Sequence, residues 1–189
     1  MSNLPANMSN MLTGLKKAKT RMATASASDG ADFLRLTKQA DWEFGKECLE
    51  VQEGSKWAIN PKSFEMGYIA WGEGVVLGEE MAPAYDDPIV KTTLPSTAAK
   101  KGWEEQYGIQ LACVSGEDKG KQVIYKSTAK GAKDEIERVL DALITKVDND
   151  EADIVAIVKL ESSSYKHSKY GKIVTPILNI VKWEPITAT

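Results

Sequence analysis

Histidine and cysteine are scarce in this sequence, which has one histidine and two cysteines among 189 residues. The single His167 excludes the histidine-rich metal sites of many hydrolases. Cys48 and Cys113 stand far apart, form no metal-binding spacing, and lie in apolar stretches typical of buried thiols. The sequence also has no phosphate-cradling glycine loop and no EF-hand spacing. We therefore predict a protein that is not an enzyme and that uses no cofactor and no metal ion.

Long hydrophobic runs are missing as well. No stretch approaches the roughly 20 apolar residues of a membrane-spanning helix. The segment Met8–Leu15 is too short and too polar for the core of a signal peptide. We therefore expect a cytoplasmic location, reduced thiols and no membrane contact.

Acidic residues are absent from the N-terminal part of the chain. Residues 1–28 contain four basic residues and no acid, whereas the remainder contains 20 of the 24 basic residues and all 27 acids, a net charge of -7. Residues 1–30 are also poor in large apolar side chains, so we predict a disordered basic tail followed by one domain over residues 31–189. An acidic body argues against phosphate binding over its whole surface, but it permits binding along a local basic groove.

The elements that are present are mostly short strands. Extended pieces are predicted at residues 33–36, 42–44, 48–51, 57–59, 66–71, 75–81, 105–115, 121–128, 154–160 and 172–183. One helix is predicted over Ala132–Val147, because its apolar residues recur at steps of three and four, and Asp134 and Glu135 would lie in its first turn. Residues 82–103 are predicted as a long connection and residues 161–171 as a polar loop.

This order of elements predicts a mainly β (α+β) fold. From Gly67 onward it matches an OB-fold, a five-stranded antiparallel barrel with one helix between strands 3 and 4. The extra N-terminal strands, before Met66, would then pad the outside of the barrel. The alternative is a generic α+β domain, in which one helix covers an antiparallel sheet, because it has the same elements.

The segment 162–172 is the most informative about function, because it combines two tyrosines, three lysines and the only histidine with no acid. Flat rings stack on bases and cations neutralise phosphates. In the OB interpretation this loop joins strands four and five, and two further basic stretches converge on the same face. The predicted nucleic-acid-binding residues are Lys91, Lys100, Lys101, Trp103, Tyr107, Lys121, Tyr125, Lys126, Tyr165, Lys166, His167, Lys169, Tyr170 and Lys172.

Two expectations about aromatic residues accompany this set. Trp103, which stands between charged residues, is expected to be exposed, whereas the tryptophans in apolar surroundings are expected in the core: Trp42, Trp57, Trp71 and Trp183. The alternative for segment 162–172 is a solvated hairpin loop in which Tyr165 and Tyr170 pack on each other.

The stretches WAINPKSFEMGYIAWG and SYKHSKYGKIVTPILNIVKW resemble a group of phage-encoded proteins of similar length, associated with DNA replication and recombination. The resemblance covers residues 55–185, and by topology the chain is similar to phage single-stranded-DNA-binding proteins with an OB core. It implies sequence-independent binding of single-stranded DNA in the host cytoplasm, with phage or host replication and recombination proteins as further partners. Many such proteins end in an acidic, partner-recruiting tail; this chain ends WEPITAT, which puts tail-mediated recruitment in doubt.

Two other functions stay open. The -7 body would suit a non-enzymatic phage protein that binds another protein, as a virion component or as an acidic inhibitor of host defence. A nuclease would need two or three carboxylates and a lysine on one sheet edge, for which Asp86, Asp87 and Lys91 are the candidates. Whether the chain forms a homo-oligomer is left open by the sequence.

Overall fold

A single ten-stranded sheet organises the protein in the computed structural model, which describes residues 31–186. Of these, residues 32–186 belong to one compact unit that begins at Asp32. The elements are β1 (Asp32–Leu36), β2 (Trp42–Phe44), β3 (Leu49–Glu50), β4 (Lys56–Ile59), β5 (Glu65–Gly72), β6 (Val75–Pro83), the 3-10 helix η1 (Lys91–Thr93), β7 (Glu104–Cys113), β8 (Gln122–Ser127), α2 (Lys130–Asp148), β9 (Asp153–His167) and β10 (Gly171–Pro185).

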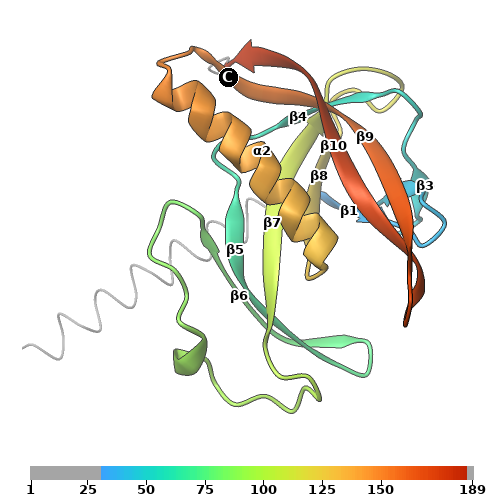
Figure 1. The fold of residues 1–189 in the computed structure, drawn as a ribbon, viewed down its shortest axis with the longest axis vertical. Coiled ribbons are helices and arrows are strands. Elements are labelled where there is room, and N and C mark those ends of the chain that lie inside the picture. The colour runs from blue at the N-terminus through green and yellow to red at the C-terminus, as the bar shows by residue number, and fades with distance from the viewer. Residues whose placement is uncertain (1–30, 187–189) are drawn as a thin grey trace, which may run out of the picture. The chain divides into compact units, whose positions relative to one another are not determined.

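The strands follow the order β10-β9-β4-β7-β8-β1-β2-β3, with β5 alongside the first half of β7 and β6 outside β5 (Figure 1). The pair β1–β8 is parallel, and the other strand pairs are antiparallel. β4 thus lies between β9 and β7 in the middle of the sheet. The expectation that the strands before Met66 pad the outside is wrong for β4, because both of its edges are needed to join β9 to β7.

The sheet curls until the turn between β1 and β2 meets β9. The indole N–H of Trp42 donates to the carbonyl oxygen of Glu161 at 2.9 Å, and the Ser162 hydroxyl donates to the carbonyl oxygen of Ala40 at 3.2 Å. These are side-chain bonds and not a strand ladder, so the sheet is curled but open, a half-barrel. The prediction of a mainly β, barrel-like fold with a helix is therefore confirmed as to its general class.

The core lies inside the curl. Alternate residues of β4, β7, β8 and β9 point inward, and Trp57, Ile109, Val123 and Val158 are each fully buried. The indole N–H of Trp57 donates to the hydroxyl of Ser55 at 2.9 Å, so this large side chain is buried without an unpaired polar atom. Burying each such side chain stabilises the fold by about 1.5–3 kcal/mol.

The helix α2 begins at Lys130, two residues before the predicted start, and buries Ala132, Ile136, Val139 and Leu143 against the core. The helix itself is therefore confirmed. The expectation that Asp134 and Glu135 occupy the first turn is wrong, because that turn contains no acid.

Glu135 instead closes the outer edge of β10. Its carboxylate accepts the backbone N–H of Leu178 at 2.6 Å, and Arg138 donates both to Glu135 at 2.7 Å and to the carbonyl oxygen of Leu178 at 2.8 Å. Two helix side chains thus satisfy a strand edge that would otherwise need another strand.

The predicted polar loop 161–171 is wrong in its extent. β9 runs through to His167 and β10 starts at Gly171, so only Ser168–Tyr170 form the turn. The long connection before β7 is confirmed, apart from the short helix η1. The predicted N-terminal tail lies outside the described residues, and none of the helices in residues 31–186 has the length and apolar character needed to cross a membrane.

We expect Glu135→Ala to lower the free energy of unfolding by about 1–3 kcal/mol, because it leaves a backbone N–H and a guanidinium without their acceptor. The neighbouring, exposed Glu137→Ala should change it by less than about 0.5 kcal/mol. Urea denaturation monitored by tryptophan fluorescence measures both, and equal effects would contradict this role for Glu135.

Candidate nucleic-acid interface

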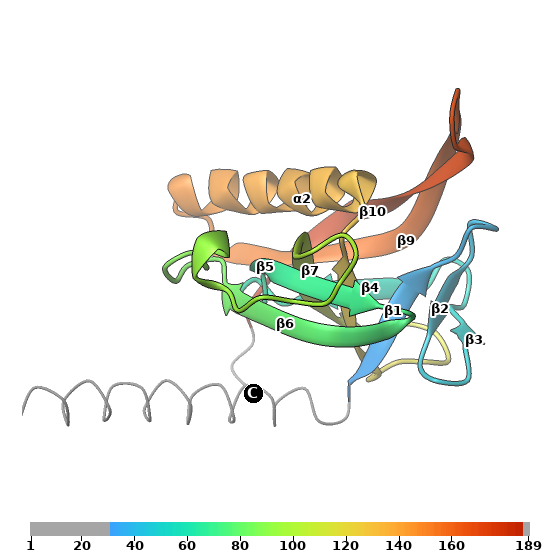
Figure 2. The same cartoon turned by 90° about the horizontal axis from the view of Figure 1, so that it is seen from below.

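The β9–β10 hairpin extends beyond the rest of the sheet. β4 pairs with β9 only from Ile157 to Lys159, whereas β9 and β10 stay paired as far as His167 and Gly171. We call residues 161–177 the arm. Figure 2 shows its tip projecting from the body on the side of α2.

The register of the arm sorts its side chains into two rows, because directly opposed residues of an antiparallel pair share a face. The inner row continues the core-facing positions of Leu160 and Leu178, and the outer row lies on the opposite face. The inner row consists of the pairs Ser162–Pro176, Ser164–Val174 and Lys166–Lys172. The outer row consists of Glu161–Ile177, Ser163–Thr175, Tyr165–Ile173 and His167–Gly171.

The tip of the arm is aromatic and basic. Tyr165 is 54% exposed and Tyr170 is 66% exposed. His167 lies against Tyr170 with 4.9 Å between ring centroids, and Lys169 Nζ is 5.3 Å from the Tyr170 ring. The Nδ1 atom of His167 accepts the backbone N–H groups of Lys169 and Tyr170 at 3.0 and 3.3 Å.

This histidine therefore organises the turn. The alternative hypothesis expected Tyr165 and Tyr170 to pack on each other, but the ring that contacts Tyr170 is that of His167. The Tyr165 ring is thus left exposed on the outer row.

Below the arm, the same outer face carries lysines that sequence reasoning missed. Lys159 lies opposite Lys56, and Lys182 lies opposite Ile157. Lys56 and Lys182 border a groove of about 560 Å³, which is lined by Lys56, Val114, Ser115, Lys119, Ile157, Val181, Lys182 and Glu184. Ile157 is buried, so the groove combines an apolar floor with a cationic rim, in which Lys182 also pairs with Glu184 at 2.8 Å.

We call Tyr165, Ile173, Lys159, Lys56, Lys182 and Lys119 the outer track. From Tyr165 to Ile157 it follows eight residues of β9, about 26 Å at the usual strand rise. The acid on this part of β9 is Glu161, whose carboxylate accepts the side-chain N–H of Asn179 at 2.9 Å. An exposed ring at one end is thereby joined to a lysine-lined groove at the other.

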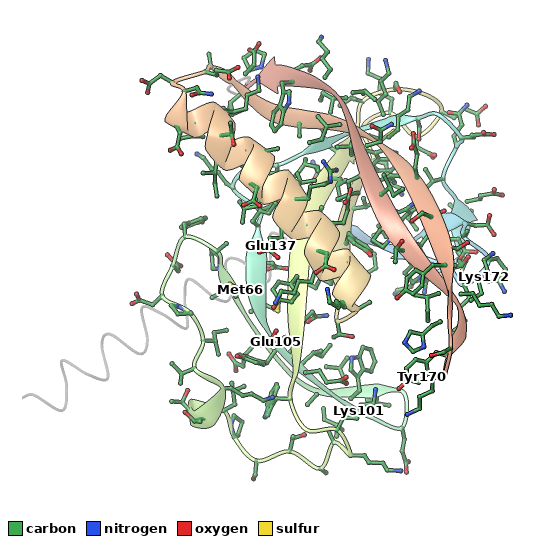
Figure 3. All side chains as sticks on the ribbon, in the orientation of Figure 1. Met66, Lys101, Glu105, Glu137, Tyr170 and Lys172 are labelled. Carbon is green, nitrogen blue, oxygen red and sulfur yellow. The ribbon has the colours of Figure 1, made fainter. Side chains whose placement is uncertain are left out.

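The predicted residues of the long connection lie elsewhere. Lys91 Nζ is 5.7 Å from the Tyr68 ring, and Lys101 pairs with Glu104 at 3.5 Å. Figure 3 shows Lys101 on the connection that leads into β7, whereas Tyr170 and Lys172 belong to the arm. Lys100 is exposed on the same connection. In Figure 2 the β5–β6 hairpin, over which this connection runs, lies well away from the arm tip.

The predicted residues of β7 and β8 are held by other protein groups. Lys126 pairs with Glu65 at 3.3 Å and with Glu79 at 3.2 Å, and Lys121 pairs with Asp32 at 2.8 Å. The Tyr107 hydroxyl donates to the carboxylate of Glu105. The Tyr125 ring is 4% exposed and packs edge-on against Trp42, so no base can stack on it. The structure thus keeps the arm residues together but does not bring the three basic stretches onto one face.

Three expectations about single residues are wrong. Trp71 is 45% exposed, although it was expected in the core. Trp103, expected at the surface, is partly covered: its ring lies against Gly78 and its N–H donates to the carbonyl oxygen of Pro95 at 2.9 Å. Cys48 is exposed, and Arg35 donates to its sulfur at 2.9 Å. Each follows from tertiary packing that the neighbouring sequence does not reveal.

The described part of the chain contains no group of three or more His, Cys, Asp and Glu side chains placed to hold a metal ion. No family model matches the chain, and no curated protein or solved structure is significantly similar to it. The resemblance to phage single-stranded-DNA-binding proteins therefore stays a prediction.

The buried position of Tyr125 predicts that the stability of the protein depends on pH. Burial raises the pKa of Tyr125 to about 12, whereas the unfolded phenol titrates near its ordinary value of 10. Between these values the unfolded chain binds fewer protons, so stability should fall by about 2–3 kcal/mol from pH 10 to pH 12. Urea denaturation at several pH values in this range should show a smaller loss of the free energy of unfolding with pH for Tyr125→Phe than for the unaltered protein. An equal loss in both proteins would contradict the burial of Tyr125.

Proposed function

We propose that this protein binds single-stranded DNA without sequence preference, and that the outer track is the binding surface. The observation that carries the proposal is the continuity of that surface, from the exposed ring of Tyr165 to the groove between Lys56, Lys119 and Lys182. Stacking rings beside a positive groove are what proteins use to hold single strands of any sequence.

The strand order supports the OB interpretation. In an OB barrel the first strand lies between the second and the fourth, the fifth lies outside the fourth, and a helix connects the third to the fourth. The order β10-β9-β4-β7-β8, with α2 between β8 and β9, matches that arrangement if β4 and β5 together are the first strand. We infer an OB-like barrel opened between its third and fifth strands. Its proposed ligand surface differs from the usual one, because it uses the first, fourth and fifth strands.

The net charge of the protein favours a local contact with DNA over a contact that involves its whole surface. The body carries a net -7, so long-range attraction to DNA is weak and binding depends on the few lysines of the track. The rings at the arm need unstacked bases, which a single strand offers and a duplex does not. A place in phage DNA replication or recombination rests on the sequence resemblance alone.

The alternative, a protein-binding module, also has an observation in its favour. The β5–β6 hairpin exposes Trp71, Val75, Val76 and Leu77, and solvent-exposed apolar groups of this size mark interaction sites. The two proposals are compatible, because the hairpin and the outer track are built from different strands.

The first test is fluorescence anisotropy of a labelled oligo-dT, with a duplex for comparison and a salt series. We expect preference for the single strand and a slope of log affinity against log salt of about -0.7 per phosphate contacted. The variant K56Q/K159Q/K182Q should make that slope about 2 less negative. The control variant K100Q/K101Q, which removes two lysines from the long connection, should leave it unchanged. No binding at low salt would overturn the proposal. If K100Q/K101Q changed the salt slope and K56Q/K159Q/K182Q did not, the outer track would not be the binding surface.

Tyr165→Ala should weaken binding by about 1–3 kcal/mol, the usual contribution of one stacked base. Tyr85→Ala removes an exposed ring from the connection after β6 and is the control, with no expected change. The same anisotropy titration measures both, and equal losses would remove Tyr165 from the proposed surface.

A further inference from the structure

Residues 65–90 form a strongly acidic stretch, which we call the acidic lobe. It contains six acids and no lysine or arginine: Glu65, Glu73, Glu79, Glu80, Asp86 and Asp87. Lys126, from β8, pairs with Glu65 and Glu79. Glu73 at the hairpin turn and Asp86 and Asp87 after β6 are exposed. The lobe therefore presents negative charge to any partner that approaches it.

The acidic lobe is also the most apolar part of the described surface. Seven of the fifteen large hydrophobic side chains that are exposed in residues 31–186 belong to it, namely Met66, Trp71, Val75, Val76, Leu77, Tyr85 and Val90. Exposed apolar groups gathered in this way mark an interaction site, whereas scattered ones do not.

β6 adds a strand edge without a further strand partner to this surface, because its partner in the described sheet is β5 alone. The connection after β6 lies against the later part of this edge, at Leu77–Glu80, and leaves the hairpin end uncovered by it. Glu73 and Gly74 both have positive φ, 50° and 81°, as in the two-residue turn that twists with its strands. In such a hairpin Val75 bonds to Gly72, so the backbone groups of Val76 point to the outer edge. An unpaired edge of this kind is a template for another strand.

The arm has the complementary character. From Ser162 to Trp183 the chain has no acid, and the arm carries Lys166, Lys169 and Lys172. Lys166 and Lys172 are directly opposed on the inner row, where like charges destabilise a strand pair. None of these three lysines has a carboxylate partner in the described residues, so an anionic partner would relieve their repulsion.

Within one chain the two surfaces do not meet, since Figure 2 shows the arm tip projecting well away from the β5–β6 hairpin. A second copy of the chain offers an acidic lobe to the arm of the first copy and an arm to its acidic lobe. A symmetric pairing of two β6 edges about Val76 and Leu77 is disfavoured, because it would set Glu73 opposite Glu80 of the other copy.

We propose that the protein self-associates head to tail, with the arm of one copy docked on the acidic lobe of the next. This contact joins two different surfaces, so each added copy leaves one arm and one lobe free and assembly continues beyond a dimer. The inference does not rest on DNA binding, because the inner row is the face of the arm opposite to the outer track and the lobe is built from other strands.

Sedimentation velocity of the nuclease-treated full chain tests the proposal without DNA. At about 0.05 M salt the sedimentation coefficient should rise with protein concentration past that of a dimer, and at about 0.5 M salt it should return to that of a monomer. A monomer at every concentration in low salt would overturn the proposal, as would association that disappears once nucleic acid is removed.

Charge reversal identifies the two surfaces. The variants K166E/K172E and E73K/D86K/D87K should each stay monomeric alone, because like charges then meet at the contact. An equal mixture of the two should associate again, since each reversed surface meets its complement, and only folded variants can do so. The control K38E/K46E has the same charge change as the first variant and should associate like the unaltered protein. Association of either reversed variant alone, or no association in the mixture, would overturn the assignment.

Discussion

Backbone N–H and C=O groups at the edge of a sheet need partners, and β10 is one of the strands at which this sheet ends. Glu135 and Arg138 of α2 bond the N–H and the carbonyl oxygen of Leu178 at that edge. This contact sets the helix against β10, and the helix in turn buries Ile136 and Val139 in the core. At Leu178 the helix therefore supplies the partners that a further strand would otherwise provide.

β9 connects the core to the proposed binding surface. Its fifteen residues pair with β10 along their length, but with β4 only at Ile157–Lys159. The paired part is held by the core through Val158, and the remainder extends as the arm. Strict alternation along one strand therefore produces a buried face, a lysine-bearing outer face and an arm with two different rows.

Charge is separated along the chain, with consequences in three dimensions. The acidic stretch 65–90 builds β5 and β6, and the acid-free stretch 162–183 contains the whole arm except Glu161. Since the fold holds these two segments apart, a slightly negative protein presents one acidic and one basic surface (Figure 2). Net charge alone, -3 for the chain, does not describe such a molecule.

Local chemistry in the sequence was enough to predict most elements. The helix stripe, the alternation in β7 and the glycine-bounded hairpins predicted their elements to within a few residues, because these signals depend on near neighbours in the chain. The segment 162–172 was likewise singled out by its composition. The strand ends were misjudged there, since serines and lysines in an arm exposed on both faces look like a loop.

Tertiary structure alone decided which residues share a face. Lys56 and Lys159 are far apart in sequence and meet only through the β4–β9 register, while Lys126 is held by two carboxylates from β5 and β6. Tyr125, which was predicted to contact nucleic acid, is buried, and Trp71, which was expected in the core, is exposed. Both differences arise because burial depends on what the curled sheet brings against each strand. The sequence by itself determined a β-rich chain with one helix and a basic aromatic segment. Long-range pairing determined the groove, because opposing side chains are set by strands that the local sequence does not specify.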